Sequence, residues 1–247
     1  VIAVRANNVT VNVDAASTVT AAGNYSYAIS FKSKSDIDTP ATGSSVTVAG
    51  TITGNILADL NGNTVKVKAE YADELAAAGY ATIEAENGLV AAIKAVAKIG
   101  ETYYATLAEA FDAAQDGKTI TVLQYIEVSE TIVNTKKVTL NLNGKTVTMV
   151  YTQKATKNHT MISNSGNLTI QSSVEGGKLS YTYAGEDLGT THFANTVTSN
   201  PGSVLTVKSG TIENLTFDSG IIAYAIDGLT NGGAGDVTVN IEGGVIT

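Results

Sequence analysis

Apolar and polar residues alternate in short runs along most of the chain, and one run recurs. It places apolar residues at the first and third positions and threonine between them: Val138-Thr139-Leu140, Leu168-Thr169-Ile170, Leu205-Thr206-Val207 and Val237-Thr238-Val239. A period of two is typical of strands that bury one face, so the threonines should form an outward row. The runs start 30, 37 and 32 residues apart (168−138, 205−168, 237−205). A constant strand with variable spacing predicts the coils of a solenoid.

One amphipathic helix is expected just before these strands. Thr106 and Glu109 have the spacing of a capping box, and Gly117 ends the segment. Apolar residues between them recur on one helical stripe: Leu107, Ala110, Phe111 and Ala114. Because a helix of about three turns is marginal alone in water, we expect its stripe to cover the open end of the strand stack beginning at Thr119.

The N-terminal third repeats the strand pattern, since Val9-Thr10-Val11 and Val46-Thr47-Val48 start 37 residues apart (46−9). The pattern then changes. A short helix stopped by Gly79 and a hairpin turn at Asn87-Gly88 are expected. We therefore predict three parts: residues 1–68 as the C-terminal coils of a first β-helix, 69–105 as a connector of a short helix and hairpins, and 106–247 as the start of a second β-helix with a capping helix at 106–116. Strand-like patterns at both ends suggest part of a longer protein.

Two stretches resemble known proteins. The run ATLAEAFDAAQDGKTITV, residues 105–122, resembles the opening of right-handed parallel β-helix proteins of the pectin-lyase-like superfamily, in which an N-terminal helix caps the first coil. Residues 69–111 resemble the connector between successive β-helix modules in large surface proteins of gut bacteria. The resemblance implies an all-β, right-handed parallel β-helix, or solenoid. It also implies an extracellular, cell-surface location, with signal and anchor outside this sequence and neighbouring β-helix modules of the same chain as partners.

Composition narrows the possible partners. The formal net charge is −8 and Arg5 is the only arginine, so binding to a phosphate backbone, and hence to nucleic acid, is not expected. Without cysteine the chain has no disulfide, thiol nucleophile or cysteine-based metal site. No apolar run approaches the ~20 residues needed to span a bilayer, so no membrane insertion is expected within this sequence.

The superfamily contains polysaccharide lyases and hydrolases, and the resemblance therefore raises the possibility of catalytic groups. Pectate lyases of this fold use an acidic calcium cluster and a basic residue, often arginine, whereas Arg5 is far in sequence from the second β-helix. A hydrolase would need paired inward aspartates on neighbouring coils, which the strand runs do not carry. We therefore expect no enzyme, cofactor or metal. A polysaccharide lyase or hydrolase is the alternative, as is a phage spike or fibre.

The longest interruption between strand runs spans residues 180–203 and is expected to be a loop. Its candidate ligand-binding residues are Tyr181, Tyr183, Glu186, Asp187 and His192, which combine aromatic surface with polar groups. His159 lies 33 residues before His192 (192−159), about one coil, so the histidines could be stacked neighbours. Two exposed loop histidines are favoured over a metal site. The predicted function is a non-catalytic bacterial cell-surface stalk or adhesin that presents loops for glycan or protein binding.

Overall fold

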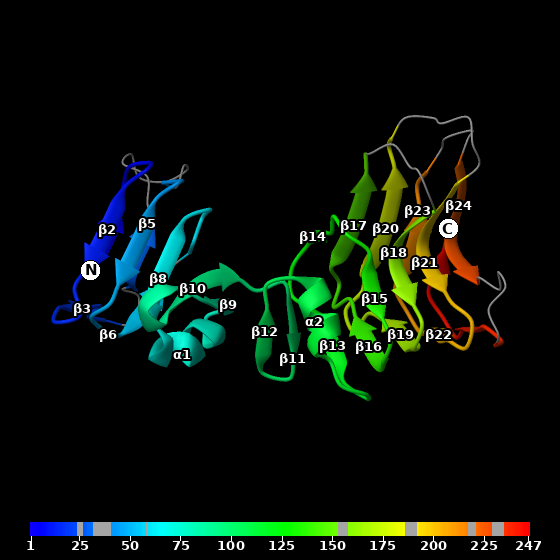
Figure 1. Cartoon of the computed structure of the whole chain (residues 1–247), viewed down its shortest axis with the longest axis horizontal. Helices are drawn as coiled ribbons and strands as arrows, with labels where there is room; N and C mark the ends of the chain where they lie inside the picture. The colour runs from blue at the N-terminus through cyan, green and yellow to red at the C-terminus, as the bar shows by residue number, and fades with distance from the viewer. Residues whose placement is uncertain are drawn as a thin grey trace. The chain divides into compact units, whose positions relative to one another are not determined.

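The strands of the computed structural model form a β-solenoid of about six turns, which confirms the all-β prediction (Figure 1). The structure describes residues 1–23, 27–31, 41–57, 59–152, 158–185, 192–216, 221–228 and 235–247. The chain divides into two compact units. Unit 1 comprises Val1–Ala95 and Glu101–Ala105, and unit 2 comprises Val96–Gly100 and Thr106–Thr247.

In unit 1 the chain passes repeatedly through three sheets, A, B and C, which is the path of a coil. Sheet A contains β1 (Ile2–Val4), β4 (Tyr27–Phe31) and β7 (Asn55–Leu57); sheet B contains β2 (Thr10–Val13), β5 (Ser45–Val48), β8 (Thr64–Lys68), β10 (Leu89–Lys94) and β9 (Tyr80–Glu84); sheet C contains β3 (Thr18–Thr20) and β6 (Thr51–Thr53). The ladders among β1 to β8 are parallel. Their inward valines and isoleucines form one buried cluster.

A short helical segment and a hairpin complete unit 1, which also contains β12 (Thr102–Tyr104). The segment consists of η1 (Ala69–Tyr71) and α1 (Ala72–Ala77), and the predicted stop follows at Gly79, with φ of 86°. The predicted hairpin is confirmed, because β9 and β10 pair antiparallel around the short η2 turn (Glu86–Gly88). Asn87 and Gly88 both have positive φ, as this tight turn requires. Since β10 also pairs antiparallel with β8, the hairpin extends sheet B.

Unit 2 repeats the coil through sheets D, E and F. Sheet D contains β11 (Ala97–Ile99), β13 (Thr119–Val122), β16 (Lys137–Asn141), β19 (Asn167–Gln171), β22 (Val204–Val207) and β25 (Thr238–Ile241); sheet E contains β14 (Ile126–Glu127), β17 (Thr146–Tyr151), β20 (Lys178–Tyr183), β23 (Thr211–Asn214) and β26 (Val245–Ile246); sheet F contains β15 (Ile132–Asn134), β18 (His159–Asn164), β21 (His192–Ser199) and β24 (Ile221–Gly228). All these ladders are parallel except that of β11 with β13.

The capping helix α2 (Leu107–Ala113) forms where it was predicted, although it ends three residues before residue 116. Both capping-box bonds are present: the Glu109 amide donates to Thr106 Oγ1 over 3.1 Å, and the Thr106 amide donates to the Glu109 carboxylate over 3.2 Å. The stripe residues of the helix are buried, and it packs against β15, β11 and β13. At its far end Lys136 Nζ donates to the Asp112 carbonyl over 2.6 Å. The helix therefore covers the first coil of unit 2, as expected.

Inward positions stack coil on coil in unit 2. Leu140, Ile170 and Val207 occupy equivalent positions in adjacent strands of sheet D, and all three are fully buried. A polar stack lies where sheet F turns into sheet D: Asn134 Nδ2 donates to Asn164 Oδ1 over 2.8 Å, and Asn164 pairs in register with Ser199. The interior of the solenoid thus carries an asparagine ladder beside its apolar core.

The outward threonine row is present in part. Thr139, Thr169 and Thr206 are register partners in adjacent strands of sheet D. In the next strand, however, the partner of Thr206 is Asn240 and not Thr238. The last coil is displaced by two residues from the alignment that the repeated run suggested. Because the side-chain period of a strand is two, this displacement leaves Val239 on the same face as Leu205, its partner in the ladder.

Candidate functional site

Three connections of unit 2 run from sheet E to sheet F over residues 152–158, 184–191 and 215–220. The connections from sheet F to sheet D range from two residues, at 135–136 and 165–166, to nine, at 229–237. The parallel registers place the ends of β17, β20 and β23 within two residues of alignment, and likewise the starts of β18, β21 and β24 (Figure 1). These six strand ends define what we call the EF corner.

An aromatic cluster lies at the EF corner. Tyr151 and Tyr183 end two adjacent strands as register partners, and their rings stack with centroids 6.0 Å apart. His159, the first residue of β18, lies against Tyr151 with ring centroids 3.7 Å apart. Tyr181 Oη and His159 Nδ1 are 3.3 Å apart, within hydrogen-bond distance. The cluster therefore joins four rings from three strands across the corner between two sheets.

The members of the cluster differ in their access to solvent. Tyr181 is fully buried and Tyr183 is 4% exposed, whereas Tyr151 and His159 are partly exposed. Burial raises the pKa of the Tyr181 phenol, and the neighbouring phenols of Tyr151 and Tyr183 raise it further. Tyr181 is thus a neutral phenol at physiological pH, and its ring lies 6.1 Å from that of His159. Tyr151 and His159 are the members that a ligand can touch.

A second aromatic pair lies on neighbouring strands of the same corner. The rings of Phe193 in β21 and Tyr224 in β24 stack with centroids 6.2 Å apart and an interplanar angle of 20°. Tyr224 is 43% exposed. The pair adds accessible aromatic surface to sheet F close to where the long connections arrive.

The prediction of a loop over residues 180–203 is wrong at both ends. Tyr181 and Tyr183 belong to β20, and His192 begins β21, so the connection is confined to residues 184–191. The missed signal is the alternation of Leu179, Tyr181 and Tyr183, which places three large apolar bodies on one strand face. Two other candidate residues, Glu186 and Asp187, lie outside the described residues.

The histidines do not stack as their spacing suggested. His159 is the register partner of Ala194, and His192 that of Ile221. The structure brings His159 to Tyr181 instead. Both histidines are partly buried first residues of strands rather than exposed loop residues, and no sequence signal selected Tyr151 for the site. Within the described part of the chain, no three histidine, aspartate or glutamate side chains gather where they could hold a metal ion.

Comparison with known proteins adds nothing to this geometry. No family model, curated protein or solved structure matches the chain. In addition, none of its described helices is long and apolar enough to cross a membrane. The chemistry of the EF corner therefore follows from its own residues: accessible rings, a histidine and backbone groups at strand ends, which suit stacking and hydrogen bonding.

Proposed function

We propose that this chain is a non-catalytic module of a bacterial cell-surface stalk or adhesin, whose EF corner binds a glycan or a protein. The observation that carries the proposal is the aromatic cluster at the EF corner, where the partly exposed rings of Tyr151 and His159 lie beside the buried tyrosines of β20. A solenoid is a rigid scaffold, and variable connections on a rigid scaffold are where binding residues commonly lie. Residues from successive coils then contact the same ligand.

The exposed members of the corner have the chemistry for such contacts. Tyr151 and His159 present partly exposed rings with polar edges, which can stack on a sugar or on an apolar side chain and hydrogen-bond at their rim. The proposed location is extracellular, because the resemblance at residues 69–122 is to modules of large surface proteins. Neighbouring modules of the same chain are the proposed structural partners.

The test is to incubate the purified chain with immobilised pectins, mucin glycans, bacterial polysaccharides and host surface proteins. Retained protein and released products are measured in the same wells. We expect retention on at least one surface without new reducing ends or unsaturated uronates. Tyr151→Ala should weaken that retention, whereas the matched variant Tyr125→Ala, at a tyrosine 69% exposed in the same unit, should not.

Each other outcome contradicts part of the proposal. Released products would make the chain a polysaccharide lyase or hydrolase. Retention that Tyr151→Ala leaves unchanged would remove the EF corner as the binding site. A stable trimer by light scattering would favour a phage spike or fibre over a stalk module.

A further inference from the structure

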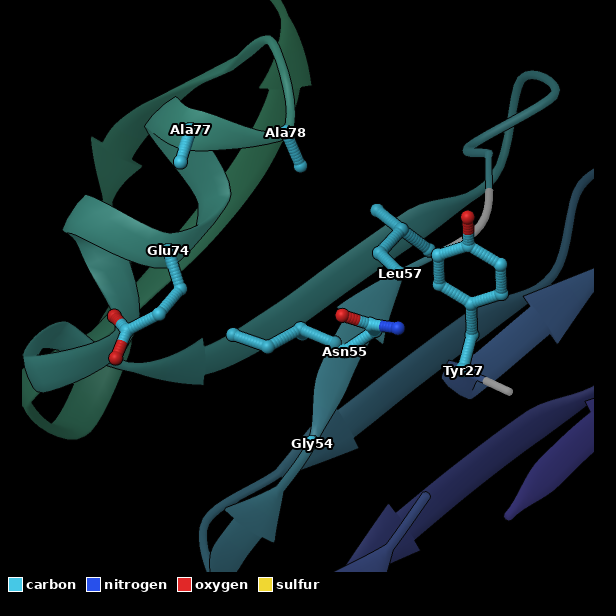
Figure 2. Close-up of a pocket in the computed structure, with 8 residues that line it drawn as sticks. Tyr27, Gly54, Asn55, Leu57, Glu74, Ala77 and Ala78 are labelled. Atoms are coloured by element: carbon cyan, nitrogen blue, oxygen red, sulfur yellow. The ribbon is translucent and has the colours of Figure 1, made fainter. Parts of the chain in front are cut away.

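Unit 1 contains a pocket of about 480 Å³ between helix α1 and sheet A (Figure 2). This volume lies in the range of small-molecule sites. One side is formed by β4 and β7, and the other by α1. The residues that matter below are Tyr27, Asn55, Leu57, Glu74, Ala77 and Ala78.

The sheet side combines a ring with an amide. Tyr27 and Asn55 are register partners in adjacent parallel strands, so their side chains leave the same face of sheet A roughly 4.8 Å apart. Tyr27 is 39% exposed, and Asn55 is exposed as well. Leu57, two residues along β7 on the same face, is 2% exposed and closes the apolar base of the pocket. Figure 2 shows Tyr27, Asn55 and Leu57 together, across from the helix.

The helix side is open and carries one carboxylate. Ala77 and Ala78 at the end of α1 have the smallest side chains after glycine and leave the space free, while Glu74 offers two acceptor oxygens. Among the described lining residues, Glu74 carries the only formal charge, and it is negative. An anionic ligand such as a uronate, sulfate or phosphate would therefore be repelled.

We propose that this pocket binds a neutral sugar residue. Its apolar C–H face stacks on the Tyr27 ring, and its hydroxyl groups bond to the Asn55 amide and the Glu74 carboxylate. A sugar has both an apolar C–H face and polar hydroxyl groups, and the pocket offers a contact to each. A peptide adding to the β7 edge fits less well, because β7 has only three residues to pair with. The site lies in unit 1 and does not depend on the proposed role of the EF corner.

The test uses the whole chain on an array of neutral oligosaccharides, derived from mucin, mannan, galactan and glucan, beside polygalacturonate, sialylated and sulfated glycans. The strongest neutral ligand is then titrated by calorimetry. Tyr27→Ala should weaken binding about tenfold, because the sugar then has no aromatic ring on which to bury its C–H face. Tyr27→Phe should retain binding, since it keeps the ring. Ala77→Met, at an exposed helix position, should abolish binding by filling the pocket.

Two controls separate the loss of this site from the loss of any exposed tyrosine and from misfolding. Tyr125→Ala, at an exposed tyrosine of unit 2 outside both proposed sites, should leave the affinity unchanged. Thermal melting confirms that each variant is folded, and Ala77→Met provides the test if Tyr27→Ala does not fold. The proposal is overturned if no neutral oligosaccharide binds, if anionic glycans bind more tightly, if an extended peptide competes for the site, or if Ala77→Met leaves binding intact.

Discussion

Replacing Asn164 with alanine tests the role of the asparagine ladder in unit 2. The Asn164 side chain is fully buried at the end of β18. Its Oδ1 accepts from Asn134 Nδ2 over 2.8 Å and from the Gly166 amide over 3.2 Å. Its Nδ2 donates to the Val204 carbonyl over 3.1 Å and to Ser199 Oγ over 3.4 Å. One side chain therefore connects three successive coils.

The expected cost follows from these bonds. The contact with Ser199 is long, so three good hydrogen bonds are lost, and each buried bond contributes about 1 kcal/mol net. We expect Asn164→Ala to lower the free energy of unfolding by about 3 kcal/mol. For a unit of this size, such a loss lowers the melting temperature by roughly 6–12 °C. The alanine methyl group cannot satisfy the Gly166 amide or the Val204 carbonyl, and the narrow interior limits access of water to them.

The assay is urea unfolding of the whole chain by circular dichroism, with calorimetric melting as a second measurement. The matched control is Asn240→Ala. Asn240 is exposed on the outer face, and the one described hydrogen bond of its side chain, to Thr206 Oγ1, is 3.5 Å long. This control should change stability by less than about 0.5 kcal/mol. If Asn164→Ala is as stable as the control, the ladder does not hold the coils together and the reasoning is refuted.

Two further predictions concern the cap and the buried phenol. Thr106→Ala removes the side-chain acceptor of the capping box and should lower stability by about 1 kcal/mol in urea unfolding, whereas Thr106→Ser should restore it; equal midpoints for all three proteins would contradict the role of the cap. Because the pKa of Tyr181 is raised in the folded state, its contribution to stability is fully present below the unfolded pKa of about 10 and falls as the pH rises above that value. The unfolding midpoint should therefore drop between pH 9.5 and 11, measured in urea titrations at each pH, and Tyr181→Phe should reduce that drop; an unchanged pH dependence would show that Tyr181 is not the group responsible.

The sequence by itself determined the local elements of this protein. Period-two alternation predicted the strands, and the recurring run predicted a solenoid. Thr106 and Glu109 located the start of α2, and Asn87-Gly88 located the β9–β10 hairpin. These features are predictable because each depends on a few neighbouring residues: a cap bond spans three positions, and a tight turn needs positive φ at two.

Only the tertiary structure decided which residues became neighbours between coils. The connections differ in length, and a strand displaced by two residues buries the same face, so the alternation cannot tell whether Thr238 or Asn240 follows Thr206. The meeting of Tyr181 with His159, which come from successive coils, depends on the same choice of register.

The pocket of unit 1 was equally invisible in the sequence. Tyr27 and Asn55 come from successive coils, and Glu74 comes from the helix that follows them. Nothing local to any of these residues marks it as part of a site. Their proximity arises from the way the coils stack and from where α1 packs, because contacts between distant segments depend on the arrangement of the whole unit.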